Sequence, residues 1–167
     1  SYDKAPLNRT RDREVDIHHI QIDVTVDLKE ESVYGQVIHS LSPLNTSLKT
    51  FTLDAEDMTI RRVRHKDKDI LFDHSGDKLH ITLDNEIGWN DTLNVRIDYT
   101  SFPRVGAFFV SPDEIYPNKP WQAWTQGEDT DNHHWVPMYD YPNERNTFEI
   151  LLTVDKKFKA VSNLSLI

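Results

Sequence analysis

The sequence has no cysteine and few glycines, and both shortages exclude classes of site. Without a thiol the chain forms no disulfide and offers no thiolate metal ligand. Only five glycines are present, and they form no glycine-rich phosphate-binding loop. The sequence also lacks His-Glu-x-x-His and Gly-x-Ser-x-Gly, so no self-contained metallohydrolase or serine-hydrolase centre is expected. No stretch approaches the roughly 20 apolar residues of a membrane span.

Basic residues are fewer than acidic ones, 19 against 28, so the formal net charge of the chain is −9. The one concentrated basic run, residues 61–66, reads as a solvated strand or turn in an acidic protein. We therefore expect no nucleic-acid partner. The four tryptophans, six tyrosines and seven phenylalanines argue against disorder, and 167 residues suit one domain.

Short alternation of apolar and polar residues dominates the sequence and predicts β-strands. Apolar residues from Ile20 to Leu28 share one face, whereas Val15 and Ile17 have the opposite parity. The change of phase at His18-His19 predicts a bulge. Turn residues at 73–77 predict a hairpin. The fold expected for residues 1–167 is an all-β, antiparallel β-sandwich, with further strands at 32–41, 48–53, 58–63, 70–72, 79–83, 93–99 and 148–154.

Residues 101–147 break this pattern. They contain six of the eight prolines and three of the four tryptophans, with little periodicity. A long segment without regular pattern is typically a functional or covering loop. Its aromatic content indicates that it packs against something.

The histidines and one acidic run are the candidate metal ligands of the sequence. His18 and His19 are adjacent on a predicted strand, so they point to opposite faces and cannot easily share an ion. His133-His134 could bind a metal, but no partner spacing supports it. Residues 128–131 begin like a calcium loop, yet histidines occupy the next ligand positions. The prediction is therefore packed or solvated imidazoles without a metal.

Gln126 and Glu128 place an amide and a carboxylate two residues apart among aromatic residues. In an extended segment such residues project to the same side, where they could converge on one ligand. A carboxylate in an aromatic niche suits an ammonium group. The alternative interpretation is an ordinary hydrogen-bonded surface loop.

Several ordered motifs resemble the aminopeptidase N family of zinc metallopeptidases, and its bacterial branch most closely. The family pattern is Gln-x-Glu, then Phe-Pro-x-x-Asp-x-Pro, then an aromatic strand and Ser-Asn. This chain has Gln126-Gly127-Glu128, Val-Pro-Met-Tyr-Asp-Tyr-Pro at 136–142, Phe-Glu-Ile at 148–150 and Ala-Val-Ser-Asn at 160–163. It departs from the pattern at Val136, where phenylalanine is usual, at Met138, where cysteine is common, and near His133, where arginine is usual.

The resemblance implies a saddle-shaped β-domain that lies against a catalytic domain, with the Gln-x-Glu loop entering the active site. Glu128 would accept hydrogen bonds from the α-ammonium group of a peptide substrate, and Gln126 would line the pocket for the first side chain. The zinc of the parent enzyme would be bound outside this chain, which is expected to continue beyond Ile167. Alone, the chain is expected to hold no stoichiometric zinc and to have no peptidase activity.

Two other functions stay open on the sequence. The parent could be a family relative without peptidase activity, in which this domain is a scaffold for protein contacts. Alternatively, the chain could be a free-standing β-sandwich that binds a ligand on an aromatic face around Trp121, Trp124 and Trp135.

Overall fold

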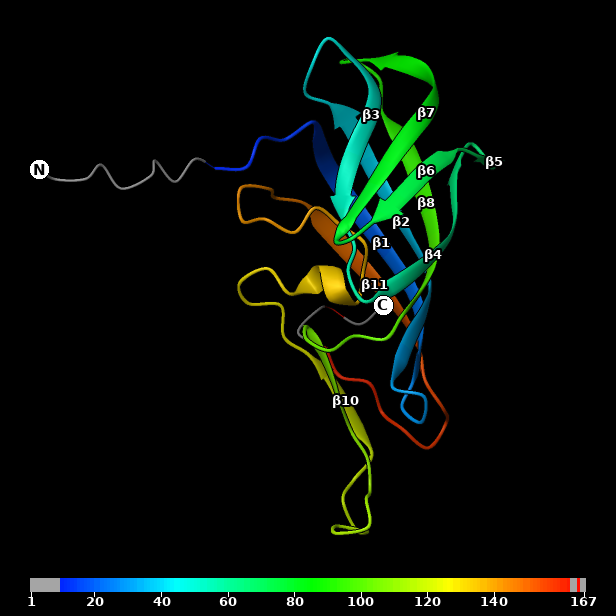
Figure 1. The fold of residues 1–167 in the computed structure, drawn as a ribbon, viewed down its shortest axis with the longest axis vertical. Helices are drawn as coiled ribbons and strands as arrows, with labels where there is room; N and C mark the ends of the chain where they lie inside the picture. Colours follow the sequence, from blue (N-terminus) through cyan, green and yellow to red (C-terminus); the bar gives the residue numbers. More distant parts are fainter. Residues whose placement is uncertain (1–9, 163–164, 166–167) are drawn as a thin grey trace, which may run out of the picture.

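The computed structural model describes residues 10–162 and 165, and within them the regular structure is almost entirely β (Figure 1). One short 3-10 helix, η1 (Asn132–His134), interrupts the strands. No helix among the described residues is long and apolar enough to cross a membrane. The strands are β1 (Val15–Asp27), β2 (Ser32–Pro43), β3 (Ser47–Asp54), β4 (Met58–His65), β5 (Lys68–Asp69), β6 (Leu71–Ser75), β7 (Lys78–Gly88), β8 (Leu93–Ser101), β9 (Ala107–Val110), β10 (Gln122–Thr125) and β11 (Thr147–Thr153).

The strands form a six-stranded sheet in the order β11-β1-β2-β8-β4-β5, a three-stranded sheet in the order β3-β7-β6, and the hairpin β9-β10. Figure 1 shows the three-stranded sheet lying across one end of the larger sheet. The predicted antiparallel sandwich is confirmed, with one exception at its edge. Strand β11 runs parallel to β1, since the long segment after β8 returns the chain to the end of the sheet at which β1 starts.

The bulge predicted in the first strand is present. The register between β1 and β2 shifts between Ile17 and His19, and apolar residues on both sides of the shift remain buried. His18 bonds to the Ser42 hydroxyl of β2 at 2.9 Å, whereas His19 bonds to Thr147 of β11 at 2.8 Å. The two imidazoles therefore serve different neighbouring strands.

The core lies between the six-stranded and three-stranded sheets. Both sheets contribute fully buried side chains, and burying each large one is worth about 1.5–3 kcal/mol. Residues of the irregular segment pack against this core. Its largest buried members are Tyr99, Phe51, Ile17, Ile20, Leu41, Leu53, Leu79, Ile81 and Ile97.

The irregular segment between β8 and β11 has two parts. Its first part contains the β9-β10 hairpin, two short strands that the sequence pattern did not predict, and Figure 1 shows this hairpin projecting away from both sheets. Its second part packs on the core, where Met138 and Asp54 form an antiparallel bridge with N–O distances of 2.7 and 3.0 Å. Buried His39 donates from Nε2 to the Pro137 carbonyl at 2.9 Å. The aromatic content of the segment indicates packing, and the second part finds its packing partner in the core.

Candidate functional site

Gln126 and Glu128 lie between the hairpin and η1, where both residues are exposed. Gln126 directly follows β10, and its backbone N–H donates to the Gly106 carbonyl at 2.9 Å. Glu128 begins a turn, and the peptide bond that follows it is cis. Because the extended backbone ends at this turn, the common direction of the two side chains stays a prediction.

Close backbone contacts hold this loop. Gly106 has a φ of +77°, and a Cβ atom there would lie 1.9 Å from the Asp131 carbonyl oxygen. A Cβ on Gly127 would lie 2.2 Å from the side chain of Asn132. At Gly106 only glycine leaves room beside a backbone atom and tolerates the left-handed backbone, whereas at Gly127 a Cβ atom would displace the Asn132 side chain. At these two glycines the backbone thus lies close to Asp131 and Asn132, where η1 begins.

Aromatic side chains border the loop, as the sequence indicated. Trp121 and Trp124 are exposed, and Trp124 stacks on Phe108 across the hairpin with ring centroids 5.5 Å apart. Trp135 is partly buried, and its indole N–H donates to Asn132 Oδ1 at 3.4 Å. An open hollow of about 520 Å³ adjoins η1, with Asn132, Trp135, Val136, Met138, Phe148 and Ile150 in its lining. Asn132 therefore lies close to Gly127 of the candidate loop and also lines the hollow.

The Val-Pro-Met-Tyr-Asp-Tyr-Pro stretch after η1 anchors the loop to the domain. Its Asp140 backbone N–H donates to Asp54 Oδ2 at 2.9 Å. Asp54 also pairs with Arg11 at 2.5 Å and with Lys78 at 2.8 Å. Burial opposes ionisation of Asp54, but hydrogen bonds from the two cations outweigh it and lower the pKa of this carboxyl. Asp54 thus links the Asp140 backbone to two cations, Arg11 and Lys78.

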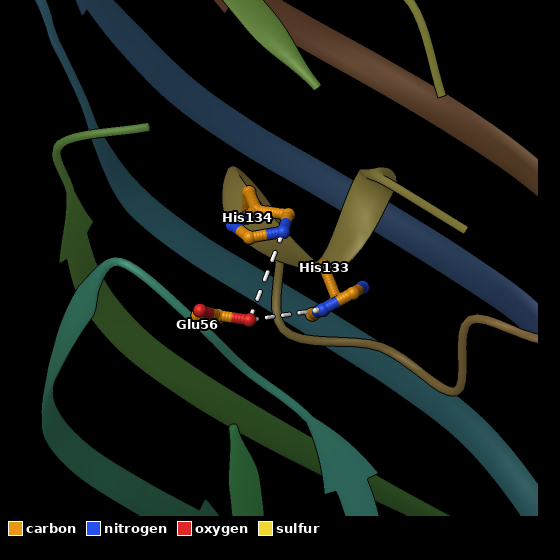
Figure 2. Close-up of side chains that lie close together, drawn as sticks. All are labelled: Glu56, His133 and His134. Atoms are coloured by element: carbon orange, nitrogen blue, oxygen red, sulfur yellow. Dashed lines mark ion pairs between the residues drawn. The ribbon is translucent and has the colours of Figure 1, made fainter. Parts of the chain in front are cut away.

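A cluster of two histidines and a glutamate lies directly after the loop (Figure 2). The Nε2 atoms of His133 and His134 stand 3.7 and 3.8 Å from Glu56 Oε2, and the dashed lines of Figure 2 mark both pairs. Glu56 comes from the β3–β4 connection, and both histidines come from η1. The three candidate ligating atoms lie within 4.8 Å of one another. The partner that sequence spacing did not supply for His133-His134 is therefore Glu56.

Each histidine also contacts an aspartate through its other ring nitrogen. His133 Nδ1 lies 3.0 Å from Asp140 Oδ2, and this hydrogen bond, opposed by partial burial, raises the pKa of His133. His134 Nδ1 lies 2.9 Å from Asp57 Oδ2. Burial works against ionisation of Asp57, yet hydrogen bonds from Arg104 and His134 lower the pKa of its carboxyl. The cluster therefore joins three carboxylates and two imidazoles.

Comparison with known proteins identifies the domain. The family model described as the peptidase M1 N-terminal domain matches residues 16–167. Leukotriene A-4 hydrolase of Xenopus laevis is 24% identical over 152 residues, which cover 87% of this chain and 25% of that protein.

Solved structures with the same fold include the M1 zinc metallopeptidase from Deinococcus radiodurans, with a TM-score of 0.72, 20% identity, and coverage of 87% of this chain and 33% of that one. Yeast LTA4 hydrolase in complex with bestatin has a TM-score of 0.73 and 17% identity, over 84% of this chain and 23% of that one. The chain thus spans about a quarter to a third of the proteins that it resembles.

Proposed function

The chain belongs to the M1 peptidase family, whose N-terminal domain it forms, and we propose that it anchors substrate for a zinc-dependent aminopeptidase. In this proposal Glu128 accepts hydrogen bonds from the free α-ammonium group of a peptide, and Gln126 lines the pocket for the first side chain. Residues 1–167 would pack against the catalytic domain of the same protein.

The observation that carries the proposal is the state of the loop. The side chains of Gln126 and Glu128 are exposed and make no hydrogen bond or ion pair with the other residues that the structure describes. Backbone hydrogen bonds nevertheless hold the loop, because the Gly127 carbonyl accepts from the Asp131 N–H at 3.3 Å and the Gly106 carbonyl from the Gln126 N–H at 2.9 Å. A fixed backbone that presents an unpaired carboxylate suits recognition of a cation more than internal stabilisation.

Physical chemistry explains why such a carboxylate favours chain ends. An α-amino group has a pKa near 8, so much of it is cationic at neutral pH, whereas an internal peptide bond carries no charge. A hydrogen bond to a charged group is worth about 1.5–3 kcal/mol. That energy selects peptides with a free N-terminus and positions their first peptide bond for reaction.

Relatives support the same class of reaction. A mutant of the Deinococcus radiodurans M1 zinc metallopeptidase has been solved with a Tyr-Ser-Ala substrate, and a mutant two-domain M1 zinc metallopeptidase has been solved with L-arginine. This chain has no His-Glu-x-x-His, so we place the zinc of the parent enzyme outside residues 1–167. There the metal would polarise the scissile carbonyl and activate water. Residues of this chain would bind and orient the substrate.

The test is steady-state kinetics of the full-length enzyme with Glu128→Ala. Loss of one charged hydrogen bond should lower kcat/KM for aminoacyl substrates by about 10- to 150-fold, from about 1.5–3 kcal/mol. The matched control is Glu114→Ala, which removes an exposed carboxylate from the connection between β9 and β10 and should leave the kinetics unchanged. Unaltered kinetics in a folded Glu128→Ala enzyme would refute the anchoring role.

A further inference from the structure

The cluster of Glu56, His133 and His134 has the arrangement of a metal site (Figure 2). Both imidazoles direct Nε2 toward one carboxylate oxygen, at 3.7 and 3.8 Å. In a tetrahedral zinc site with bonds of about 2.0–2.2 Å, neighbouring ligand atoms lie roughly 3.3–3.5 Å apart. The three ligating atoms lie within 4.8 Å of one another, and Glu56, whose side chain is 38% exposed, is free to move toward both imidazoles.

The aspartates behind the histidines fix which ring nitrogen is free. An ionised carboxylate only accepts hydrogen bonds, so Nδ1 of His133 must carry the proton that faces Asp140, and Nδ1 of His134 the one that faces Asp57. In a neutral imidazole this leaves the lone pair on Nε2, the atom that faces Glu56. Carboxylate-histidine pairs of this kind orient most metal-bound histidines and increase their basicity as ligands.

The charges nearby also suit a divalent cation. Three carboxylates, those of Glu56, Asp57 and Asp140, meet one guanidinium, that of Arg104, which pairs with Asp57 at 2.6 Å and approaches Glu56 Oε1 at 3.8 Å. With neutral imidazoles the group carries a net charge of −2. A divalent ion would neutralise it, and Glu56 Oε2 faces away from the contact with Arg104 as the remaining ligand.

We propose that Glu56, His133 and His134 bind one Zn²⁺ ion, with water in the fourth position. The proposal replaces the expectation from sequence that this chain holds no stoichiometric zinc. The ion would join the β3–β4 connection to η1, four residues after Glu128. Two imidazoles and a carboxylate form a ligand set that zinc accepts when one position stays open.

The experiment is isothermal titration of the metal-free, tag-free 167-residue chain with ZnCl₂. We expect one ion per chain for the wild type. Glu56→Gln and His133→Gln should each weaken binding by at least about 10-fold, and Asp140→Asn by about 10- to 100-fold through loss of ligand orientation. The control is the double variant His18→Gln/His19→Gln, which removes an adjacent histidine pair outside the cluster and should bind zinc like the wild type.

A second measurement uses the wild type alone, so it does not depend on the folding of any variant. Histidine ¹⁵N spectra of the apo chain should show Nδ1–H tautomers at His133 and His134, and zinc should shift the Nε2 resonances of these two histidines most. The proposal would be overturned if zinc did not bind one-to-one, or if Glu56→Gln and His133→Gln bound zinc as tightly as the wild type. Weaker zinc binding by the His18/His19 control would also overturn it. So would a larger zinc shift on other histidines, which would indicate adventitious binding.

Discussion

Buried His39 should make the stability of this domain depend on pH. The imidazole lies fully inside the core on β2, and Nε2 donates to the Pro137 carbonyl at 2.9 Å. Its Nδ1 has no hydrogen-bond partner among the described residues. Burial disfavours the charged form and lowers the pKa to about 4, with only partial opposition from the bond to Pro137.

The size of the effect follows from linkage. An unfolded histidine has a pKa near 6.5. Between pH 6.5 and 4, His39 therefore binds a proton in the unfolded chain but not in the folded chain. Stability from neutral His39 is therefore fully present above pH 6.5 and declines as the pH falls toward 4. At about 1.36 kcal/mol per pH unit, the loss between pH 7.5 and 4.5 is about 2.5 kcal/mol.

The assay is urea unfolding followed by tryptophan fluorescence at pH 7.5 and 4.5, on the wild type and His39→Gln. Glutamine keeps an N–H donor for Pro137 but does not titrate. Protonation of carboxylates destabilises both proteins alike, so the informative quantity is the difference between their two pH-dependent losses. The wild type should lose about 2.5 kcal/mol more than the variant. Equal losses would show that burial of His39 carries no linkage, and the reasoning would fail.

Two further predictions concern the loop and the activity of the chain. Gly106→Ala should lower the free energy of unfolding by clearly more than about 1 kcal/mol, since a Cβ atom would collide with the Asp131 carbonyl. Gly76→Ala is its control in the same urea assay, because Gly76 shares a positive φ but has open space around it; equal costs would contradict the clash. The isolated chain should not hydrolyse aminoacyl substrates, with or without added zinc, and turnover that persists after chromatographic purification and scales with chain concentration would contradict the division of roles proposed here.

The sequence could predict the elements whose causes are local. Alternation located the long strands, and the change of parity at His18-His19 located the bulge between Ile17 and His19. The hairpin around Gly76 followed from its turn residues. The parallel pairing of β11 with β1 could not be predicted, because it depends on where a long segment returns the chain. The short strands β9 and β10 were missed for a related reason, since they pair only with each other and bury little.

The same distinction between local and distant contacts applies to the candidate site. Gln126 and Glu128 stand two residues apart and could be selected as a pair from the sequence. Asp57 and His134 meet across 77 positions of the chain, and Glu56 reaches the histidines from the same distant turn. No spacing in the sequence marks such a contact. In the sequence this contact is indicated only by the acidic residues before β4, and acidic turns are common without any ligand.

The distribution of anchors around the loop favours Glu128 as the orienting residue. Before the loop, the bond from Gln126 to Gly106 only extends the pairing of β9 with β10 at the base of the hairpin. After the loop, Ser101 donates to the His134 carbonyl at 2.5 Å, and the bridge at Met138 and the bond from His39 secure the next four residues. Glu128 therefore stands nearer the fixed end. A carboxylate whose backbone is already placed loses less entropy on binding an ammonium group, and it defines the substrate's position more sharply than the exposed aromatics of the hairpin can.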